Sequence, residues 1–215
     1  MTSTRLELYN LAALHCSERP IADLSENTST RKTLDHAYNA GSGLVTLALE
    51  EGLWNFAMRT VEIFYTPSVE PPFGYARAFE KPVDLVRTAA ICEDEYFANP
   101  KLRYADESGY WFADEDSFYV KYVSNDASYG GDISKWPSSF VEAAGLLLAE
   151  RAAHGFNRTH SEIAALNELR EQQFVKARSR DAMSDSTKFL PQGNWTRSRR
   201  AQGRTDRGNR NQLIG

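Results

Sequence analysis

Hydrophobic residues recur at helical spacing in four stretches of the chain, residues 4–16, 28–51, 137–154 and 160–180. Within each stretch the apolar side chains fall three or four positions apart, which is the period of one face of an α-helix. We therefore expect four helices whose apolar faces pack into a core. The positions on these faces are Leu6, Tyr9, Leu11, Leu14, Leu34, Tyr38, Val45, Ala48, Leu49, Phe140, Val141, Ala144, Leu147, Leu148, Ile163, Leu166, Leu169 and Phe174.

Polar residues and glycines mark where these helices begin, bend and end. Thr159 and Glu162 have the spacing of a capping box, which predicts the start of the last helix. Gly41 and Gly43 weaken the middle of the stretch 28–51, so we expect a bend or a close backbone approach there. Gly52 is a natural stop for that helix. Its candidate N-caps are Ser25, Asn27 and Thr28.

Between residues 55 and 126 the pattern changes from helical to extended. β-branched and aromatic residues dominate residues 58–66, and this run ends at Pro67. Proline is favourable in the first turn of a helix, so Pro82 predicts a short helix over residues 82–90. Acidic turns separate the later strands. The further strands that we expect are residues 75–79, 101–105, 109–113 and 117–124.

These patterns predict an α+β fold that is mainly α. We expect a bundle of about four helices with a β-rich insertion at residues 55–126, followed by an extended C-terminal arm. The body spans residues 1–180 and the arm spans residues 181–215. Fifty to two hundred residues is the usual size of a domain, so 215 residues allow one domain with an appendage.

Composition narrows the class of protein. Hydrophobic residues make up 41% of the chain and charged residues 25%, which is typical of a globular domain. No run of eighteen apolar residues occurs, so we expect no membrane span. The first residues lack the apolar stretch of a signal peptide, and we expect synthesis and assembly in the cytoplasm. Cys16 and Cys92 are too few for a disulfide scaffold or a zinc cluster, and we expect both to be buried.

The charge is divided unevenly along the chain. The net charge of −4 combines about +6 in residues 187–215 with about −10 in the remainder. The basic segment holds few apolar residues, so on its own it cannot bury enough apolar surface to become ordered. Such a basic arm on an acidic body is typical of a segment that meets a partner.

No catalytic constellation is found in the sequence. Glycine-rich phosphate loops, nucleophile elbows and paired zinc-binding histidines are all absent. The four histidines are scattered, and we assign them no catalytic or metal-binding role. Acidic residues cluster at 93–95 and 114–116, but neither spacing fits a calcium loop, and we interpret both as solvated turns. We therefore expect no enzymatic activity, no cofactor and no metal.

Trp195 stands alone among arginines within the arm. An isolated aromatic residue beside arginine is typical of an interface hot spot. We interpret the arm as a docking segment whose contact residues are Phe189, Leu190, Trp195, Arg197, Arg199, Arg200 and Arg204. The alternative is a basic-tailed protein that binds nucleic acid through salt-dependent phosphate contacts. The acidic body disfavours that alternative, because it would repel a duplex.

Several segments between residues 5 and 155 resemble, in order and spacing, one family of phage proteins. They begin with an opening helix and include an aromatic–Pro–x–Asp segment and a closing helix rich in alanine and leucine. The segments are Leu6–Leu14, Asp23–Thr28 with Arg31 and Leu34, Leu49–Ala57, Tyr75–Arg87, and Pro137 with Phe140 and the residues to Ala153. Together they look like the tail tubular protein A family, the head-to-tail adaptors (connectors) of short-tailed phages.

This resemblance implies a structural protein of the virion. In that family twelve copies form a ring at the head–tail junction, below the portal protein, that prolongs the channel for the DNA. The ring receives the tail tube (nozzle) and in some phages the tail fibres. Genomic DNA would pass through the channel during ejection without specific binding, and the arm would dock on the portal. The C-terminal arm resembles the family only loosely, through its tryptophan and arginines.

Overall fold

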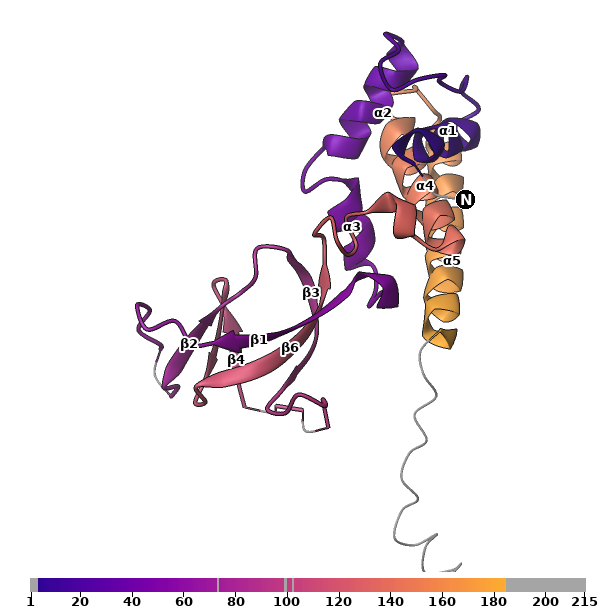
Figure 1. Cartoon of the computed structure of the whole chain (residues 1–215). Helices are drawn as coiled ribbons and strands as arrows, with labels where there is room; N and C mark the ends of the chain where they lie inside the picture. Colours follow the sequence, from indigo (N-terminus) through magenta and orange to yellow (C-terminus); the bar gives the residue numbers. More distant parts are fainter. Residues whose placement is uncertain (1–3, 73, 99, 102, 185–215) are drawn as a thin grey trace, which may run out of the picture. The chain divides into compact units, whose positions relative to one another are not determined.

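The computed structural model describes residues 4–184, apart from residues 73, 99 and 102 (Figure 1). These residues form a mixed α and β structure with five α-helices and two small antiparallel sheets. The helices are α1 (Arg5–His15), α2 (Ser29–Asn39), α3 (Leu44–Glu50), α4 (Ser138–Ala153) and α5 (His160–Met183). The strands are β1 (Met58–Phe64), β2 (Arg77–Glu80), β3 (Leu85–Cys92), β4 (Ala105–Glu107), β5 (Tyr110–Ala113) and β6 (Ser117–Ser124).

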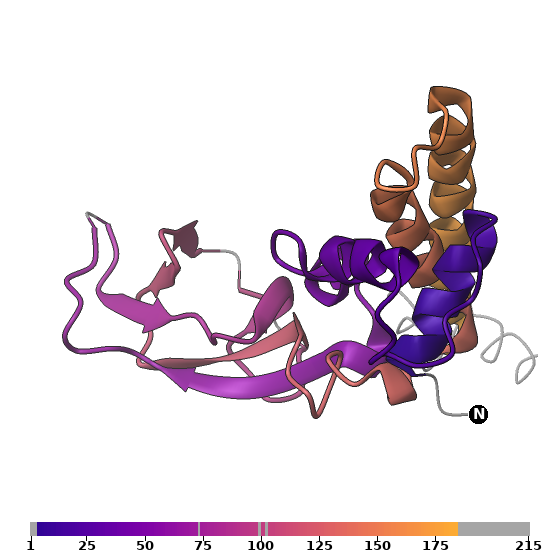
Figure 2. The ribbon, with the colours of Figure 1, turned by 90° about the horizontal axis from the view of Figure 1, so that it is seen from above.

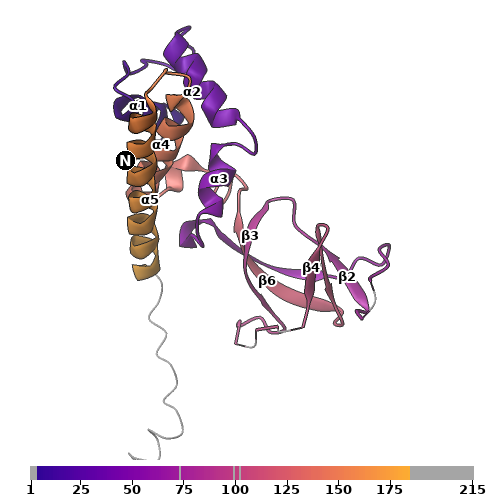
Figure 3. The ribbon, with the colours of Figure 1, turned by 180° about the vertical axis from the view of Figure 1, so that it is seen from behind.

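Helix α4 is the centre of the helical part. It packs against each of the other four helices, and α5 lies beside it over most of its length (Figures 1 and 3). Of its 16 residues, 11 are buried, because a helix that has neighbours on several sides must be apolar nearly all round. Phe140, Ala144 and Leu147 are buried there, as the sequence predicts. The helices therefore group around α4, and the expected bundle of about four helices is not reproduced in that form.

The expected single helix over residues 28–51 is wrong. Helix α2 ends at Asn39 and α3 begins at Leu44. Between them Gly41 and Gly43 have φ angles of +63° and +83°, a backbone conformation that glycine adopts without steric cost. The two glycines thus separate two helices instead of bending one. Arg151 of α4 caps the C-terminal end of α2, since its guanidinium donates to the carbonyl of Ala40 at 2.6 Å.

The expected helix over residues 82–90 is also wrong, because most of that stretch belongs to strand β3. Here β3 pairs antiparallel with β6, which supplies it with backbone partners along one side. Its short apolar run fits a helix and a strand equally well in sequence, and the pairing with β6 decides between them. The strand expected at residues 101–105 begins only at Ala105, so the acidic pair Asp106 and Glu107 lies in β4 and not in a turn.

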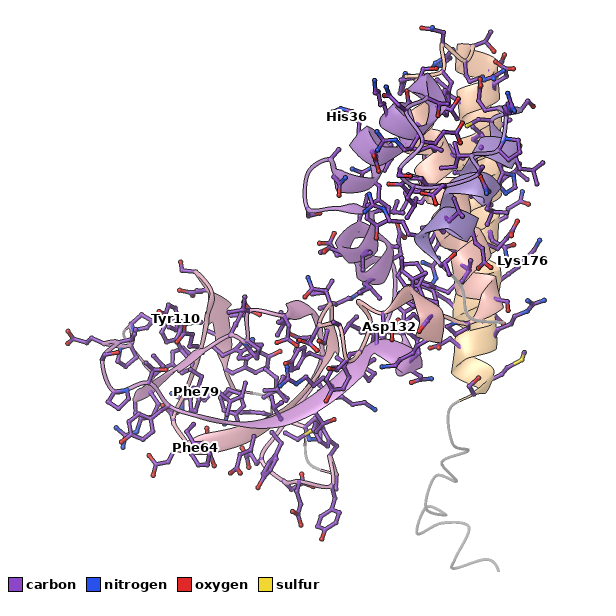
Figure 4. All side chains as sticks on the ribbon, turned by 45° about the horizontal axis from the view of Figure 1, so that its top comes forward. His36, Phe64, Phe79, Tyr110, Asp132 and Lys176 are labelled. Atoms are coloured by element: carbon purple, nitrogen blue, oxygen red, sulfur yellow. The ribbon has the colours of Figure 1, made fainter. Side chains whose placement is uncertain are left out.

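The two sheets have strand orders β1-β6-β3 and β2-β5-β4. The turn at residues 114–116 leads from β5 in one sheet to β6 in the other. Between the sheets lies a second core, centred on Phe79, Trp111 and Phe118, separate from the core around α4. Figure 4 places Phe79 within this β part. Both cysteines are buried, as expected, and Trp54, Trp111 and Trp136 are buried as well.

Two apolar residues predicted on buried faces are exposed instead. Leu14 at the end of α1 is 71% exposed, and Leu169 in α5 is 49% exposed. The helical period alone therefore placed these two side chains on the wrong face. The capping box of α5 is confirmed, since Thr159 and Glu162 bond each other's backbone amides. Helix α5 ends at Met183, three residues beyond its expected end. No helix in the described ranges is both long and apolar enough to cross a bilayer.

Candidate functional site

The predicted docking residues Phe189, Leu190, Trp195, Arg197, Arg199, Arg200 and Arg204 all lie outside the described residues. What the structure does describe is the base from which that segment continues. This base is the C-terminal half of α5 together with residues 49–57, the segment that carries much of the resemblance to the adaptor family. We call these two elements the α5 anchor.

Hydrogen bonds hold α5 within the anchor. Arg178 donates to the carbonyl of Glu51 at 2.7 Å, and the Glu51 carboxylate lies 3.6 Å from the same guanidinium. Nearer the end of the helix, the Asp181 carboxylate accepts from the amide of Asn55 at 2.9 Å. The Asn55 side chain returns a bond to the Asp181 carbonyl at 3.0 Å. Four contacts thus hold the C-terminal half of α5 against residues 51–55.

An aromatic cluster forms the apolar floor of the anchor. Trp54 is buried, and its ring lies 4.7 Å from that of Phe140 and 6.2 Å from that of Phe174, measured between centroids. The indole Nε1 has no hydrogen-bond acceptor among the described residues. A cavity of about 80 Å³ adjoins the ring, and Ser139, Arg180 and Asp181 are among its lining residues. The cavity is therefore partly polar and has room for little more than water-sized groups.

The acidic cluster at residues 114–116 forms a turn, as expected, but its carboxylates are not simply solvated. Each carboxylate has its own cation. The pairs are Asp114 with Arg103 at 3.6 Å, Asp116 with Arg77 at 3.0 Å, and Glu115 with Lys101. Arg77 lies in β2, while Lys101 and Arg103 both lie in the loop between β3 and β4, so these pairs tie the turn between the two sheets to that loop.

Lys101 is the buried member of this network. Its side chain is only 3% exposed, and its ammonium also lies 3.4 Å from Glu93 in the other acidic cluster. Burial raises the pKa of Glu115, but the hydrogen bond and charge of Lys101, together with backbone hydrogen bonds, outweigh it and leave the pKa lowered. The two acidic clusters therefore compensate a buried cation. Sequence reasoning missed this role, since nothing in the pattern marks Lys101 as buried.

Asp84 is the end of the aromatic–Pro–x–Asp segment and ties the loop before β3 to the sheet. Its carboxylate accepts from Arg59 at 2.9 Å, from the hydroxyl of Tyr122 at 3.1 Å, and from Ser124. Its carbonyl accepts from the amide of Asn125 at 3.0 Å. Burial raises the pKa of Asp84, but the bonds from Ser124, Arg59 and Tyr122 outweigh it and leave the pKa lowered. Asp84 therefore has a structural role in these contacts.

The four histidines do not come together. His15 lies 3.3 Å from the carboxylate of Glu142, while His36, His154 and His160 are exposed on different elements (His36 is labelled in Figure 4). Within the described part of the chain, no group of three or more histidine, cysteine, aspartate or glutamate side chains is arranged to hold a metal ion.

Neither a match to a known protein family nor a significantly similar curated protein was found for this chain.

Proposed function

We propose that this chain is a structural virion protein of a phage, a head-to-tail adaptor that forms a ring below the portal. The number of twelve subunits in this ring follows from the resemblance to the tail tubular protein A family. The five helices serve as the helical bundle of the adaptor body. The ring prolongs the DNA channel and receives the tail tube (nozzle) and fibres.

The observation that supports the proposal is the structural role of two segments that resemble the adaptor family. Residues 49–57 form half of the α5 anchor, and residues 75–87 end in the Asp84 contacts that fix the loop before β3. Both segments hold elements together and contain no reactive pair. A protein whose distinctive sequence serves architecture, and whose charge separates into an acidic body and a basic arm, suits an assembly role.

The charge distribution supports both proposed roles, the acidic body as a channel lining and the basic arm as a docking segment. Identical subunits in a ring contact each other through two different surfaces of each subunit. The ring closes only if the rotation from one subunit to the next divides a full turn evenly. An acidic body can line a channel without gripping DNA, because like charges repel the phosphates. The basic arm is the complementary part, and we propose that it docks on the portal with Trp195 as its apolar anchor.

The test is electron microscopy of the purified protein mixed with the portal protein. We expect rings seated on the portal for the full chain. Deleting residues 185–215 should leave a body with unchanged circular dichroism that no longer attaches. Trp195→Ala should weaken attachment by about 2 kcal/mol per subunit if it is a hot spot. Gln212→Ala, in the same arm but without an aromatic ring, is the matched control and should attach normally.

The same variants separate the second candidate, a nucleic-acid-binding accessory protein. If the truncated chain still joined the portal, the docking role of the arm would be wrong. Binding of the full chain to duplex DNA, falling steeply with salt and lost on truncation, would then favour the nucleic-acid role.

A further inference from the structure

Among the residues that the structure describes, the two sheets have four edge strands, and three of these are protected against pairing with another chain. Strands β2 and β4 have only four and three residues. Strand β3 shifts register twice against β6 and is covered near its end, where Lys101 donates its amide to the carbonyl of Ile91 at 2.9 Å. Short strands, irregular register and covering segments are the usual means by which proteins block a free edge.

Strand β1 is different. It has seven residues and pairs with β6 in unbroken register from Met58 opposite Val123 to Phe64 opposite Ser117. It is the outermost strand of its sheet, with β6 beside it (Figure 2). Beyond its bonds to β6, no backbone hydrogen bond of residues 58–64 to another described residue is found. Just after the strand, Tyr65 donates its amide to the carbonyl of Asp116 and Thr66 donates its amide to that of Ala78 in β2, so β2 meets the chain only beyond the end of β1. A long regular edge of this kind can accept another strand.

The surface beside β1 is hollowed and partly apolar. A groove of about 520 Å³ runs between β1 and the loop before β3, and Val61, Ile63 and Pro82 contribute apolar lining. At its rims Phe64 is 65% exposed and Val83 is fully exposed. Figure 4 labels Phe64 at the end of β1. The edge is thus flanked by apolar groups that water covers in the isolated chain.

The charges along the groove have no dominant sign. Its lining carries the cations Arg59 and Lys81 and the carboxylates Glu62, Glu80 and Asp84. Arg59 is paired with Asp84, and Lys81 is paired with Asp106. A strongly acidic or basic partner finds no complementary surface here. A surface of mixed sign is instead compatible with a second copy of itself.

We propose that two copies of this chain pair through β1, antiparallel about a two-fold axis at Val61. With the axis at this residue, all seven residues of β1 find a partner, because positions 58 and 64 are equally far from it. Val61 then faces Val61 of the second copy, Met58 faces Phe64, and Thr60 faces Glu62. An axis at Glu62 would instead bring two carboxylates together, which is unfavourable.

This pairing belongs to the free protein and is independent of the proposed ring. A single head-to-tail ring contains no two-fold axis that relates neighbouring subunits, so the β1 pair must separate before a ring forms. It covers the exposed edge and the apolar rims of the groove, which would otherwise favour uncontrolled association. The pair is therefore a protected state of the subunit before assembly.

The first test is an oxidative cross-link. Directly opposite residues of antiparallel strands have Cα atoms about 4.5–5.5 Å apart, within the range of a disulfide. Val61→Cys should give a covalent dimer under mild oxidation. Thr60→Cys is the matched control, since its two copies would lie diagonally, about 7–8 Å apart, and should cross-link several-fold less. Equal yields from the two variants would overturn the proposed register.

The second test measures mass without introducing cysteine. The wild-type chain, with no partner present, should sediment as a dimer at micromolar concentrations. Phe64→Lys should shift it to the monomer at the same concentration, because a charge replaces the apolar contact with Met58. Tyr96→Lys is the control, since Tyr96 is similarly exposed, at 83%, but lies outside β1 and its groove. A wild-type monomer, or an oligomer that Phe64→Lys leaves unchanged, would refute the pairing.

These outcomes are distinct from those that decide the proposed function. A chain that is monomeric alone but forms rings on the portal would refute the β1 pair and leave the adaptor role standing. A β1-linked dimer that never joins the portal would do the reverse.

Discussion

The Arg59 guanidinium lies 2.9 Å from the Asp84 carboxylate, joining β1 to the loop that leads into β3. The Asp84 side chain is only 18% exposed, so its charge must be compensated within the protein. Arg59 supplies the charge, and the hydroxyls of Tyr122 and Ser124 supply further hydrogen bonds. This single carboxylate therefore fixes the loop against two neighbouring strands.

Replacing Asp84 should destabilise the fold measurably. Asp84→Asn keeps the shape of the side chain but removes its charge, which leaves Arg59 without a counterion. Since hydrogen bonds to charged groups contribute about 1.5–3 kcal/mol, we expect a loss of that size in the free energy of unfolding. Urea unfolding followed by circular dichroism measures it. Asp116→Asn is the control: its side chain is 77% exposed, and the loss should stay within about 0.5 kcal/mol. Equal losses would show that the Asp84 contacts are not special.

The same carboxylate predicts a dependence of stability on pH. The pKa of Asp84 is lower in the folded protein than in the unfolded chain, where an aspartate has a pKa of about 3.9. The stabilisation is therefore fully present above that value and is lost as pH falls through the lower, folded pKa. Urea midpoints measured from pH 6 down to pH 2.5 should fall less steeply in Asp84→Asn than in the wild type. Parallel curves would contradict the assignment.

The sequence pattern predicts where the helices and strands of this fold lie better than it predicts which of them contact one another. Helical periodicity located α1, α4 and α5, because each carries apolar residues at regular spacing over several turns. The helix expected from Pro82 over residues 82–90 is wrong, because β6, the partner that makes most of this stretch a strand, is about thirty residues away. The burial of Lys101 depends likewise on Glu93 and Glu115, which only the folded chain brings together. Long-range pairing is thus what local patterns leave undetermined.

Leu147 provides a test of the core around α4. Its side chain is 2% exposed and lies on the same helix as the buried Phe140 and Ala144. Leu147→Ala should lower the free energy of unfolding by about 2–5 kcal/mol, through lost burial and the cavity left behind. Leu169→Ala is the control from α5, where the leucine is 49% exposed, and its cost should be much smaller. A thermal midpoint unchanged by Leu147→Ala would mean that α4 is turned wrongly in this description.

Gly145 provides the sharpest test of how α1 meets α4. A Cβ atom at this position would lie 2.4 Å from Cδ2 and 2.8 Å from Cγ of Leu11, so the leucine side chain covers the glycine directly. Glycine to alanine in a helix normally stabilises by about 1 kcal/mol. Here we expect the overlap, which costs about 1–3 kcal/mol, to outweigh that gain and lower the stability.

A double-mutant cycle separates this overlap from other effects of Gly145→Ala. Leu11→Ala alone should destabilise, because it uncovers Gly145 and removes apolar contact between α1 and α4. In the Leu11→Ala background, however, Gly145→Ala should become neutral or stabilising, since its Cβ then has room and only the helix propensity remains. The coupling energy between the two sites should reach about 1 kcal/mol or more, as for residues in direct contact. Additive effects in urea unfolding would mean that α1 and α4 do not approach at Leu11 and Gly145.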